Sequence, residues 1–430
     1  MKFTAVGDVL IGRRLNAEDK GLKELAPIIN KGEVKFFNLE TTLNKVGECY
    51  ASENSGGTWL RTNPEVLDDV KMYGFNMTSF NNNHAMDYSF EGLLSTLDKV
   101  EESGLVHAGV GRNLAEAAAP KYLDTPSGRV ALISLNSDCD FMIASEQTNI
   151  MKGRPGVNPL RHNHYVELEA EDFDALTRII KKTGVNIQRE MDKRDGYYGG
   201  VDDTVEEVGG LKFKKGEETR RVRTCNTQDL ERVKKAIYEA QLQADYIVIS
   251  VHSHDQNAGD PMEPTPYLEE FVHFCIDNGA HCVIGHGPHL LRPIEIYKGR
   301  PIFYSLGDFV LQLYNVEVAP EEFYNQYGLT AKSTVHELLK TRSKDFKIGL
   351  MQKEVMNQTV IPYWEMKDGK VESITLYPVS IDMNGNKAER GLPRLDKDAK
   401  FMDEFARRCA LYGTTLTKNA DGTYSCSWKK

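Results

Sequence analysis

The N-terminal two thirds of the chain repeat one pattern of apolar and polar positions. A short apolar run rich in β-branched or aromatic residues stops at a polar residue, and a segment with helical spacing follows. The segment at 91–103 shows this spacing through Leu93, Leu97 and Val100, which predicts an amphipathic helix covering a sheet. Strands that alternate with helices predict an α/β fold. The apolar runs lie at 3–6, 34–37, 77–80, 130–135, 246–251, 282–284 and 302–305.

The pattern changes after Leu313. A helical stretch is predicted at 320–339, and two strands at 347–364 and 371–378 are joined through Asp368 and Gly369, a frequent hairpin turn. A closing helix and a small hairpin follow near the end of the sequence. We therefore expect a core domain at 1–312 and a C-terminal part at 313–430 packed on the same domain.

Residues 137–226 interrupt the alternation with a polar, glycine-containing stretch, which we interpret as an insertion or lid. It contains Arg-Pro-Gly-Val-Asn-Pro-Leu-Arg at 154–161 and a basic run at 212–223. Long segments of this kind either shape a substrate pocket or are surface loops without a role, and both readings remain open.

Composition narrows the class of protein. The formal net charge of −10 argues against a general nucleic-acid binder, because binding the phosphate backbone needs a positive face. The 7 cysteines form no CxxC pair and are expected to be reduced core thiols. No signal peptide, membrane anchor or spanning segment is predicted, so we expect a cytoplasmic protein. The oligomeric state is not legible from the sequence.

Five of the apolar runs end at side chains that bind metal ions or protons. Because the carboxyl ends of strands in an open α/β sheet lie along one edge, we expect these side chains to converge in one cleft. Carboxylate, carboxamide and imidazole together favour Mn, Zn or Fe. The residues are Asp8, Glu40, Asn83, His84, His252, His254, His286 and His289.

Each of these positions also has a structural interpretation. Asp8 follows a glycine and could close a turn, and asparagines such as Asn83 favour turns. The Gly-His-Gly-Pro-His segment at 285–289 is the most specific signal, because glycine and proline fix a tight loop. His252 and His254 would point to opposite sides if their strand continued, so His254 is expected to contact substrate or support a ligand.

These motifs, in this order, resemble the CapA-like family of poly-gamma-glutamate capsule biosynthesis proteins, which is related to the calcineurin-like metallophosphoesterases. The resemblance implies a four-layer α/β/β/α metallophosphoesterase-like sandwich, with the C-terminal strands completing the second sheet. It covers roughly the first 311 residues. The matching segments lie at 6–8, 38–40, 82–88, 252, 285–289 and 304–309, with a further likeness at 154–161.

The resemblance also implies roles for single residues. His84 falls where the superfamily has its general acid, and Arg161 and Arg154 could hold a substrate carboxylate or phosphate. One or two divalent ions are implied. No histidine follows Asp8 in the Asp-x-His arrangement of ordinary metallophosphoesterases, so the number of ions stays open. The implied metal ligands are Asp8, Glu40, Asn83, His252, His286 and His289.

Three functions follow from these observations. The first is a hydrolase that uses metal-activated water on a phosphoester or amide. The second is a metal-assisted epimerase of a peptide or amino-acid Cα, similar to lasso-peptide epimerases, with Asp8 and His289 as the two proton-transferring groups. The third is a non-catalytic poly-gamma-glutamate assembly factor. The substrate would be a small molecule, a peptide or a polyglutamate-like chain.

Overall fold

The computed structural model describes residues 1–197 and 204–429. The chain forms two compact units, one from Met1–Leu160 and Glu231–Lys430 and the other from Arg161–Leu230. The second unit therefore begins later than the insertion predicted at 137–226, because residues before 161 pack in the first unit, where Met142 and Val157 join its core. Residues 198–203 of the predicted insertion lie outside the described part.

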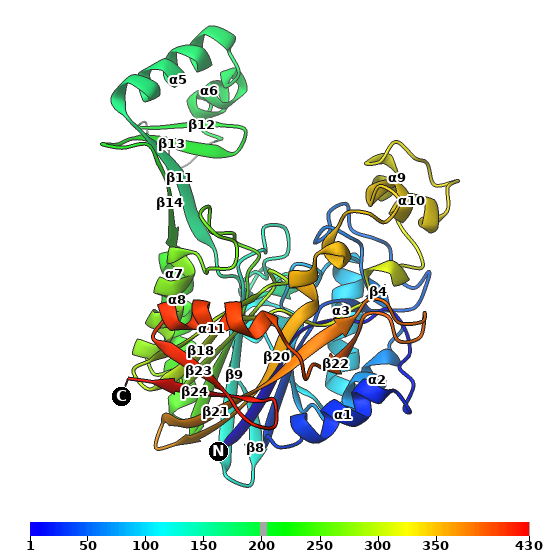
Figure 1. Cartoon of the computed structure of the whole chain (residues 1–430). Coiled ribbons are helices and arrows are strands. Elements are labelled where there is room, and N and C mark those ends of the chain that lie inside the picture. Colours follow the sequence, from blue (N-terminus) through cyan, green and yellow to red (C-terminus); the bar gives the residue numbers. More distant parts are fainter. Residues whose placement is uncertain (198–203, 430) are drawn as a thin grey trace. The chain divides into compact units, whose positions relative to one another are not determined.

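The first unit contains two large sheets, and the larger one has 10 strands and contains both the start and the end of the chain (Figure 1). Two further strands pair beside its main path, β19 with β1 and β22 with β21. In spatial order the strands are β23 (Thr414–Lys418), β24 (Tyr424–Trp428), β21 (Lys370–Asp382), β20 (Gln358–Lys367), β1 (Lys2–Leu10), β2 (Val34–Leu39), β5 (Met77–Ser79) and β6 (Val106–Ala108), with β19 (Asp308–Leu311) and β22 (Leu392–Leu395) beside them.

The C-terminal strands extend this first sheet, rather than the second sheet as predicted. β20 pairs antiparallel with β1, with Phe3 opposite Trp364, and the two rings stack at 5.1 Å between centroids. β1 pairs in parallel with β2 on its other side. Strand alternation predicts which side chains share a face, but it does not specify which sheet the strand joins.

The second sheet has 6 strands, and its four central strands are parallel. Its central strands are buried along almost their whole length, which explains their continuous apolar sequence. In spatial order the strands are β17 (Leu291–Tyr297), β18 (Arg300–Leu306), β16 (Cys282–His286), β15 (Tyr246–His252), β9 (Gly128–Asn136) and β8 (Lys121–Thr125).

The two sheets share one apolar core, which contains Phe3 and Phe36 from the first sheet and Val248 and Ile284 from the second. Another apolar cluster lies between the first sheet and helices α1, α2 and α3, on the side shown in blue and cyan in Figure 1. The first unit is thus a mixed α/β structure. Its helices are α1 (Lys20–Ile29), α2 (Val66–Lys71), α3 (Ser89–Glu102), α4 (Leu114–Ala118), α7 (Thr227–Gln241, which begins in the second unit), α8 (Pro266–Asp277), α9 (Glu321–Asn325), α10 (Val335–Arg342) and α11 (Phe401–Leu411).

Several short helices, strands and 3-10 turns connect the main elements of the first unit. The helical stretch predicted at 320–339 consists of two helices, α9 and α10, and the first half of the strand predicted at 347–364 forms short 3-10 turns. The remaining elements of the first unit are β3 (Thr42–Leu43), β4 (Arg61–Thr62), β7 (Val110–Gly111), β10 (Gly156–Val157), η1 (Leu313–Asn315), η2 (Leu350–Gln352) and η3 (Glu354–Asn357). None of the helices within the described residues is both long and apolar enough to cross a bilayer.

The second unit is a small sheet with two helices. Its strands lie in the order β12, β13, β11, β14, and its longest helix, α5, exposes most of its surface. The elements are β11 (His162–Leu168), α5 (Ala170–Thr183), α6 (Ile187–Arg194), β12 (Val205–Val208), β13 (Leu211–Lys215) and β14 (Arg220–Cys225).

Close packing of two backbones places β1 beside the turn that precedes β19. A Cβ at Gly7 would lie 1.8 Å from the carbonyl oxygen of Gly307, which is far inside van der Waals contact. We expect Gly7→Ala to lower the free energy of unfolding by about 3 kcal/mol or more, at or beyond the upper end of ordinary overpacking, because the obstructing atom is backbone. Urea denaturation of both proteins measures this. Gly259→Ala, where the nearest atom is 3.6 Å away, should change stability little.

Candidate metal centre

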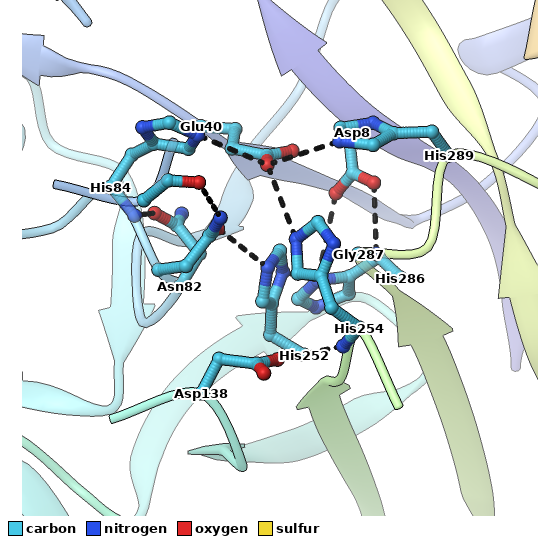
Figure 2. Close-up of polar contacts among 12 residues, drawn as sticks. Asp8, Glu40, Asn82, His84, Asp138, His252, His254, His286, Gly287 and His289 are labelled. Atoms are coloured by element: carbon cyan, nitrogen blue, oxygen red, sulfur yellow. Dashed lines mark hydrogen bonds and ion pairs between the residues drawn. The ribbon is translucent and has the colours of Figure 1, made fainter. Parts of the chain in front are cut away.

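Strand ends from both sheets place carboxylates and imidazoles around one point (Figure 2). Asp8 lies at an irregularity in β1, where the register with both neighbouring strands shifts, and such bulges re-aim side chains. Glu40 directly follows β2, and His84 follows β5 after a short turn. His252 and His286 are paired at the ends of the parallel strands β15 and β16. All five side chains lie in the first unit and are buried.

The Glu40 carboxylate lies in the middle of the group. Its Oε1 atom is 4.0 Å from His84 Nε2, 3.9 Å from His254 Nε2 and 4.0 Å from His289 Nε2. The side chain is fully buried, and neither carboxylate oxygen has a hydrogen-bond partner within the described residues. A buried carboxylate without partners is costly, so this arrangement favours a bound cation between the oxygen and the imidazoles.

Two hydrogen bonds hold the Asp8 carboxylate, whereas the Glu40 carboxylate has none in the described structure. Asp8 Oδ1 accepts a hydrogen bond from Asn38 Nδ2 at 2.7 Å, and Asp8 Oδ2 accepts one from the backbone N–H of Gly287 at 2.9 Å. His286 Nδ1 is 3.6 Å from Oδ1. The two donors fix the carboxylate plane and leave it facing His286 and His252, with which it forms a group of potential ligands within 4.8 Å of one another.

A chain of hydrogen bonds joins His286 and His252. The Ser250 hydroxyl lies 2.7 Å from His286 Nε2, the two Nδ1 atoms are 2.9 Å apart, and His252 Nε2 is 2.9 Å from Asn83 Oδ1. Because an amide oxygen only accepts, His252 donates through Nε2 and accepts through Nδ1, and the hydroxyl donates to His286. Asn83 therefore binds an imidazole here, and its Nδ2 donates to the Gly56 carbonyl.

Two histidines on opposite sides of Glu40 are each paired with an aspartate. His84 Nδ1 lies 2.6 Å from Asp87 Oδ2, and His289 Nδ1 lies 2.7 Å from Asp308 Oδ1. Asp87 is itself held by the backbone N–H groups of Gly56 and Leu60. Pairing through Nδ1 fixes each ring and directs its Nε2 toward the centre.

The glycine-rich loop explains how two histidines reach the same point. A Cβ at Gly287 would lie 2.9 Å from the backbone nitrogen of Ser253 and 3.1 Å from the His252 ring, so only glycine allows this approach. His289 adopts a left-handed backbone conformation with φ of 57°, which is uncommon for a residue other than glycine and marks a constrained position.

Burial shifts the proton affinity of the carboxylates upward. Burial and the charge of Asp308 raise the pKa of Asp8 from 3.8 to about 6. Burial and the charges of Asp8 and Asp308 raise the pKa of Glu40 well above its ordinary value, and burial also raises that of Asp308. Three like charges in one dry site repel one another, and a multivalent cation would relieve that repulsion.

The histidines show the complementary effect. Burial lowers the pKa of His286 to about 3, and burial with neighbouring imidazoles lowers the pKa values of His252 and His254. Burial also opposes the charged form of His289, but the Asp308 carboxylate outweighs it and raises the pKa of His289. Neutral imidazoles are the form that binds metal ions, so most of the cluster is ready for ligation near neutral pH.

The side chains present fit a divalent cation on chemical grounds. His254 Nε2, Glu40 Oε1 and Asp308 Oδ2 are buried polar atoms without hydrogen-bond partners in the described part of the chain. Two groups of potential ligands within 4.8 Å contain Glu40, and a third lies next to them. The mixture of carboxylate and imidazole suits Mn, Zn or Fe. The three groups are Glu40 with His254 and His289, Asp8 with Glu40, His289 and Asp308, and Asp8 with His252 and His286.

Three aspartates of the centre were not among the predicted site residues. Asp87 and Asp308 pair with histidines, and Asp138 forms a further potential ligand group with His252 and His254. Burial raises the pKa of Asp138 to about 7. Asp138 follows β9 and Asp308 follows β18, so the strand-end rule could have found both.

Of the three predicted substrate-binding residues, His254 lies at the candidate metal centre. β15 ends at His252, so strand alternation does not apply to His254, whose ring centroid lies 5.0 Å from that of His252. The Arg161 guanidinium is paired with Asp229 within the second unit. The exposed Arg154 donates two hydrogen bonds to the Ile143 carbonyl oxygen. Substrate contacts by these two arginines stay predictions.

The fold and this centre define a mixed α/β protein with a candidate metal site at the ends of its strands. A sequence model of the family described as "Bacterial capsule synthesis protein PGA_cap" matches residues 2–313, and the chain belongs to this family. The predicted relationship to the CapA-like proteins is thereby confirmed.

Individual relatives span most of the chain. The uncharacterized protein y4sH of Sinorhizobium fredii is 29% identical and covers 96% of this chain and 90% of its own length. The PGA biosynthesis protein CapA of Bacillus subtilis is 22% identical over 85% of this chain and 80% of its own. The crystal structure of a hypothetical protein from Thermus thermophilus aligns with 88% of this chain and 98% of its own, at 11% identity and a TM-score of 0.38, a score that does not define the fold.

Proposed function

We propose that this chain is a metal-dependent hydrolase whose centre holds one or two divalent ions. Asp8, His252 and His286 would hold one ion, and Glu40, His254 and His289 would hold the other. The observation that carries the proposal is the buried Glu40 carboxylate, which faces three imidazole Nε2 atoms and has no hydrogen-bond partner in the described structure. When bound, such an ion supplies Lewis-acid polarisation and makes water acidic enough to ionise near neutral pH.

His84 supports a hydrolytic role because it is positioned to transfer a proton. Its Nδ1 is fixed by Asp87, and its Nε2 faces the centre. Protonated on Nε2, the ring would donate a proton to the leaving amine or alkoxide of an amide or phosphoester. Its burial excludes bulk water, which strengthens such interactions.

The substrate class is proposed from the relatives. The names of the Bacillus relatives refer to capsule and PGA biosynthesis, and a Mycobacterium tuberculosis relative is named a probable polyglutamine synthesis accessory protein. We extend this to an amide within a peptide or polyglutamate-like chain as the preferred substrate of this centre, with a phosphoester as the alternative. The four-layer sandwich, the core at 1–312 and a cytoplasmic location belong to the same proposal.

The paired histidine–aspartate dyads favour a second candidate, an epimerase. His84 with Asp87 and His289 with Asp308 both direct Nε2 toward Glu40, from the segments that follow β5 and β16. One ring would remove a Cα proton, and the other would return a proton to the opposite face. Asp8 is less suited to this role than the sequence suggested, because both its oxygens accept hydrogen bonds.

One assay separates these functions. The full chain, supplied with Mn²⁺ or Zn²⁺, is incubated in D₂O with a γ-glutamyl peptide and, separately, with a phosphoester. A hydrolase releases amine or phosphate, and EDTA stops the release. An epimerase instead incorporates deuterium at Cα and leaves every amide intact.

Absence of both reactions under metal-replete conditions would contradict both enzymatic proposals. It would leave the non-catalytic polyglutamate assembly factor. Binding of the polymer that is sensitive to salt and needs no metal would support that third function.

A further inference from the structure

A second site of a different chemistry lies beside the metal centre. A cavity of about 700 Å³ is lined by Arg13, which follows β1, by residues of the segment 314–357, and by residues 383–390. All of these residues belong to the first unit. None of them is among the potential metal ligands described above, so the cavity has no assigned role.

The cavity is positively charged in a protein with a net charge of −10. Arg13, Lys387 and Arg390 line it, and Glu354 is the one carboxylate among its lining residues. Within the described chain, none of the three cations has a carboxylate partner. Lys387 and Arg390 are exposed at the surface, whereas Arg13 is half-buried. Three cations against one carboxylate in the lining favour an anionic ligand.

Two buried donors point to the same ligand chemistry. Arg13 Nη2 and Asn315 Nδ2 are buried nitrogen atoms without an acceptor in the described structure, and both residues line the cavity. Leaving such donors unpaired costs free energy that an anionic oxygen would recover. The Arg390 guanidinium lies 5.7 Å from the centroid of the Tyr314 ring, and the Tyr314 hydroxyl donates a hydrogen bond to the Arg390 carbonyl oxygen. These two contacts hold Arg390 and Tyr314 together on one side of the cavity.

The cavity continues on one side into an apolar space of about 230 Å³. Tyr314, Leu339 and Phe346 border both spaces, and Ile348 and Leu350 line the smaller one. A ligand that fills both spaces would therefore have an anionic group at the arginines and an apolar portion several carbon atoms long.

On its other side the cavity approaches the metal centre. Asn315 and Val316 also line a space of about 10 Å³ that reaches Glu40, a space the size of one water molecule. A Cβ at Gly12 would lie 2.7 Å from the Asn315 Cβ, so the glycine allows η1 to pack this close to the end of β1.

The geometry points to a binding site for a small amphipathic anion, a carboxylate or phosphate joined to an apolar chain, held by Arg13, Lys387 and Arg390. This inference concerns binding alone and holds independently of the proposed hydrolase or epimerase activity. For the same reason it is tested on the metal-free protein, so that failure of the catalytic proposal leaves the result interpretable.

Calorimetric titration of the full chain, treated with EDTA, tests the site with three probes. These are octanoate, octyl phosphate and the neutral octanamide. We expect one or both anions to bind at least about tenfold more tightly than octanamide, since charge-assisted hydrogen bonds to arginine are among the strongest polar contacts. The anion that binds better identifies the carboxylate or the phosphate as the preferred group. Acetate should bind more weakly than octanoate.

Substitutions test whether Lys387 and Arg390 bind the anion. The double variant Lys387→Gln/Arg390→Gln should weaken anion binding about tenfold and leave octanamide unchanged. Lys353→Gln removes an exposed charge from the same segment without lining the cavity and should have no effect. Binding of both octanoate and octyl phosphate no tighter than that of octanamide, or loss of binding in Lys353→Gln alone, would overturn the inference. Undetectable binding of every probe would do the same.

Discussion

Glutamine in place of Glu40 is expected to reduce the affinity for Mn²⁺ or Zn²⁺ by at least about 100-fold and to abolish any metal-dependent activity. Changes to residues that merely support metal ligands typically cost 10–100-fold, so loss of a charged ligand at the centre of three imidazoles should cost more. Metal content after gel filtration, with titration of the metal-free protein, measures the effect. Glu372→Gln, an exposed position, is the matched control.

In the metal-free protein, Glu40→Gln is expected to make the free energy of unfolding less dependent on pH. The pKa of Glu40 is raised in the folded state by burial and by Asp8 and Asp308, so the folded state holds a proton that the unfolded chain releases. Stability of the metal-free protein therefore falls as the pH rises above about 4.5, the ordinary glutamate value, and keeps falling until the folded-state pKa is passed. Glutamine carries no proton to lose.

Chemical denaturation at pH 5 and pH 8 with EDTA present tests this linkage. The wild-type protein should lose more stability between these values than Glu40→Gln does. If the substitution instead destabilised the metal-free protein equally at both pH values, Glu40 would be a structural residue and not a site prepared for a cation.

Asparagine in place of His84 is expected to lower kcat by about 10²–10⁴-fold while the bound metal is retained, because general acid–base groups contribute in that range. An asparagine amide can still donate to Asp87, so the pairing that holds this turn should survive. Activity and metal content are measured together. Because His84 lies 4.0 Å from Glu40 Oε1, retained metal is the result that separates proton transfer from ligation.

Two further results make this prediction specific. His273→Asn, which removes a ring paired with Glu295 outside the centre, should leave kcat unchanged. The pH profile of His84→Asn should lose one of its two limbs, a change that a purely structural role would not produce. Wild-type turnover in His84→Asn would remove His84 from the mechanism under either proposed function.

The position of the candidate centre was predictable because most of its residues obey one physical rule. Glu40 and His252 stand where apolar strands stop, at the edge where strand ends gather, whereas Asp8 reaches the same point from a bulge inside β1. Asp138 obeys the same rule but lies in the segment that the sequence pattern assigned to an insertion. Its pairing with the backbone of His254 depends on where β15 ends, which a local pattern does not fix.

The C-terminal third was less predictable. α10 opens with a capping box, in which Thr334 and Glu337 bond each other's backbone, and this motif was readable in the sequence as the start of a separate helix. The sheet that receives β20 was not readable, because it depends on the long-range contact of Phe3 with Trp364. The electrostatic state of the centre also depends on burial, which only the three-dimensional arrangement reveals.

The antiparallel pairing of β20 with β1 limits how the chain can be shortened. The family match ends at residue 313, yet a fragment that stopped there would leave the β1 edge at Lys2, Phe3 and Thr4 without its ladder. Exposed edges of this kind recruit strands from other molecules. Such a fragment would be prone to aggregate during expression, although it retains every candidate ligand.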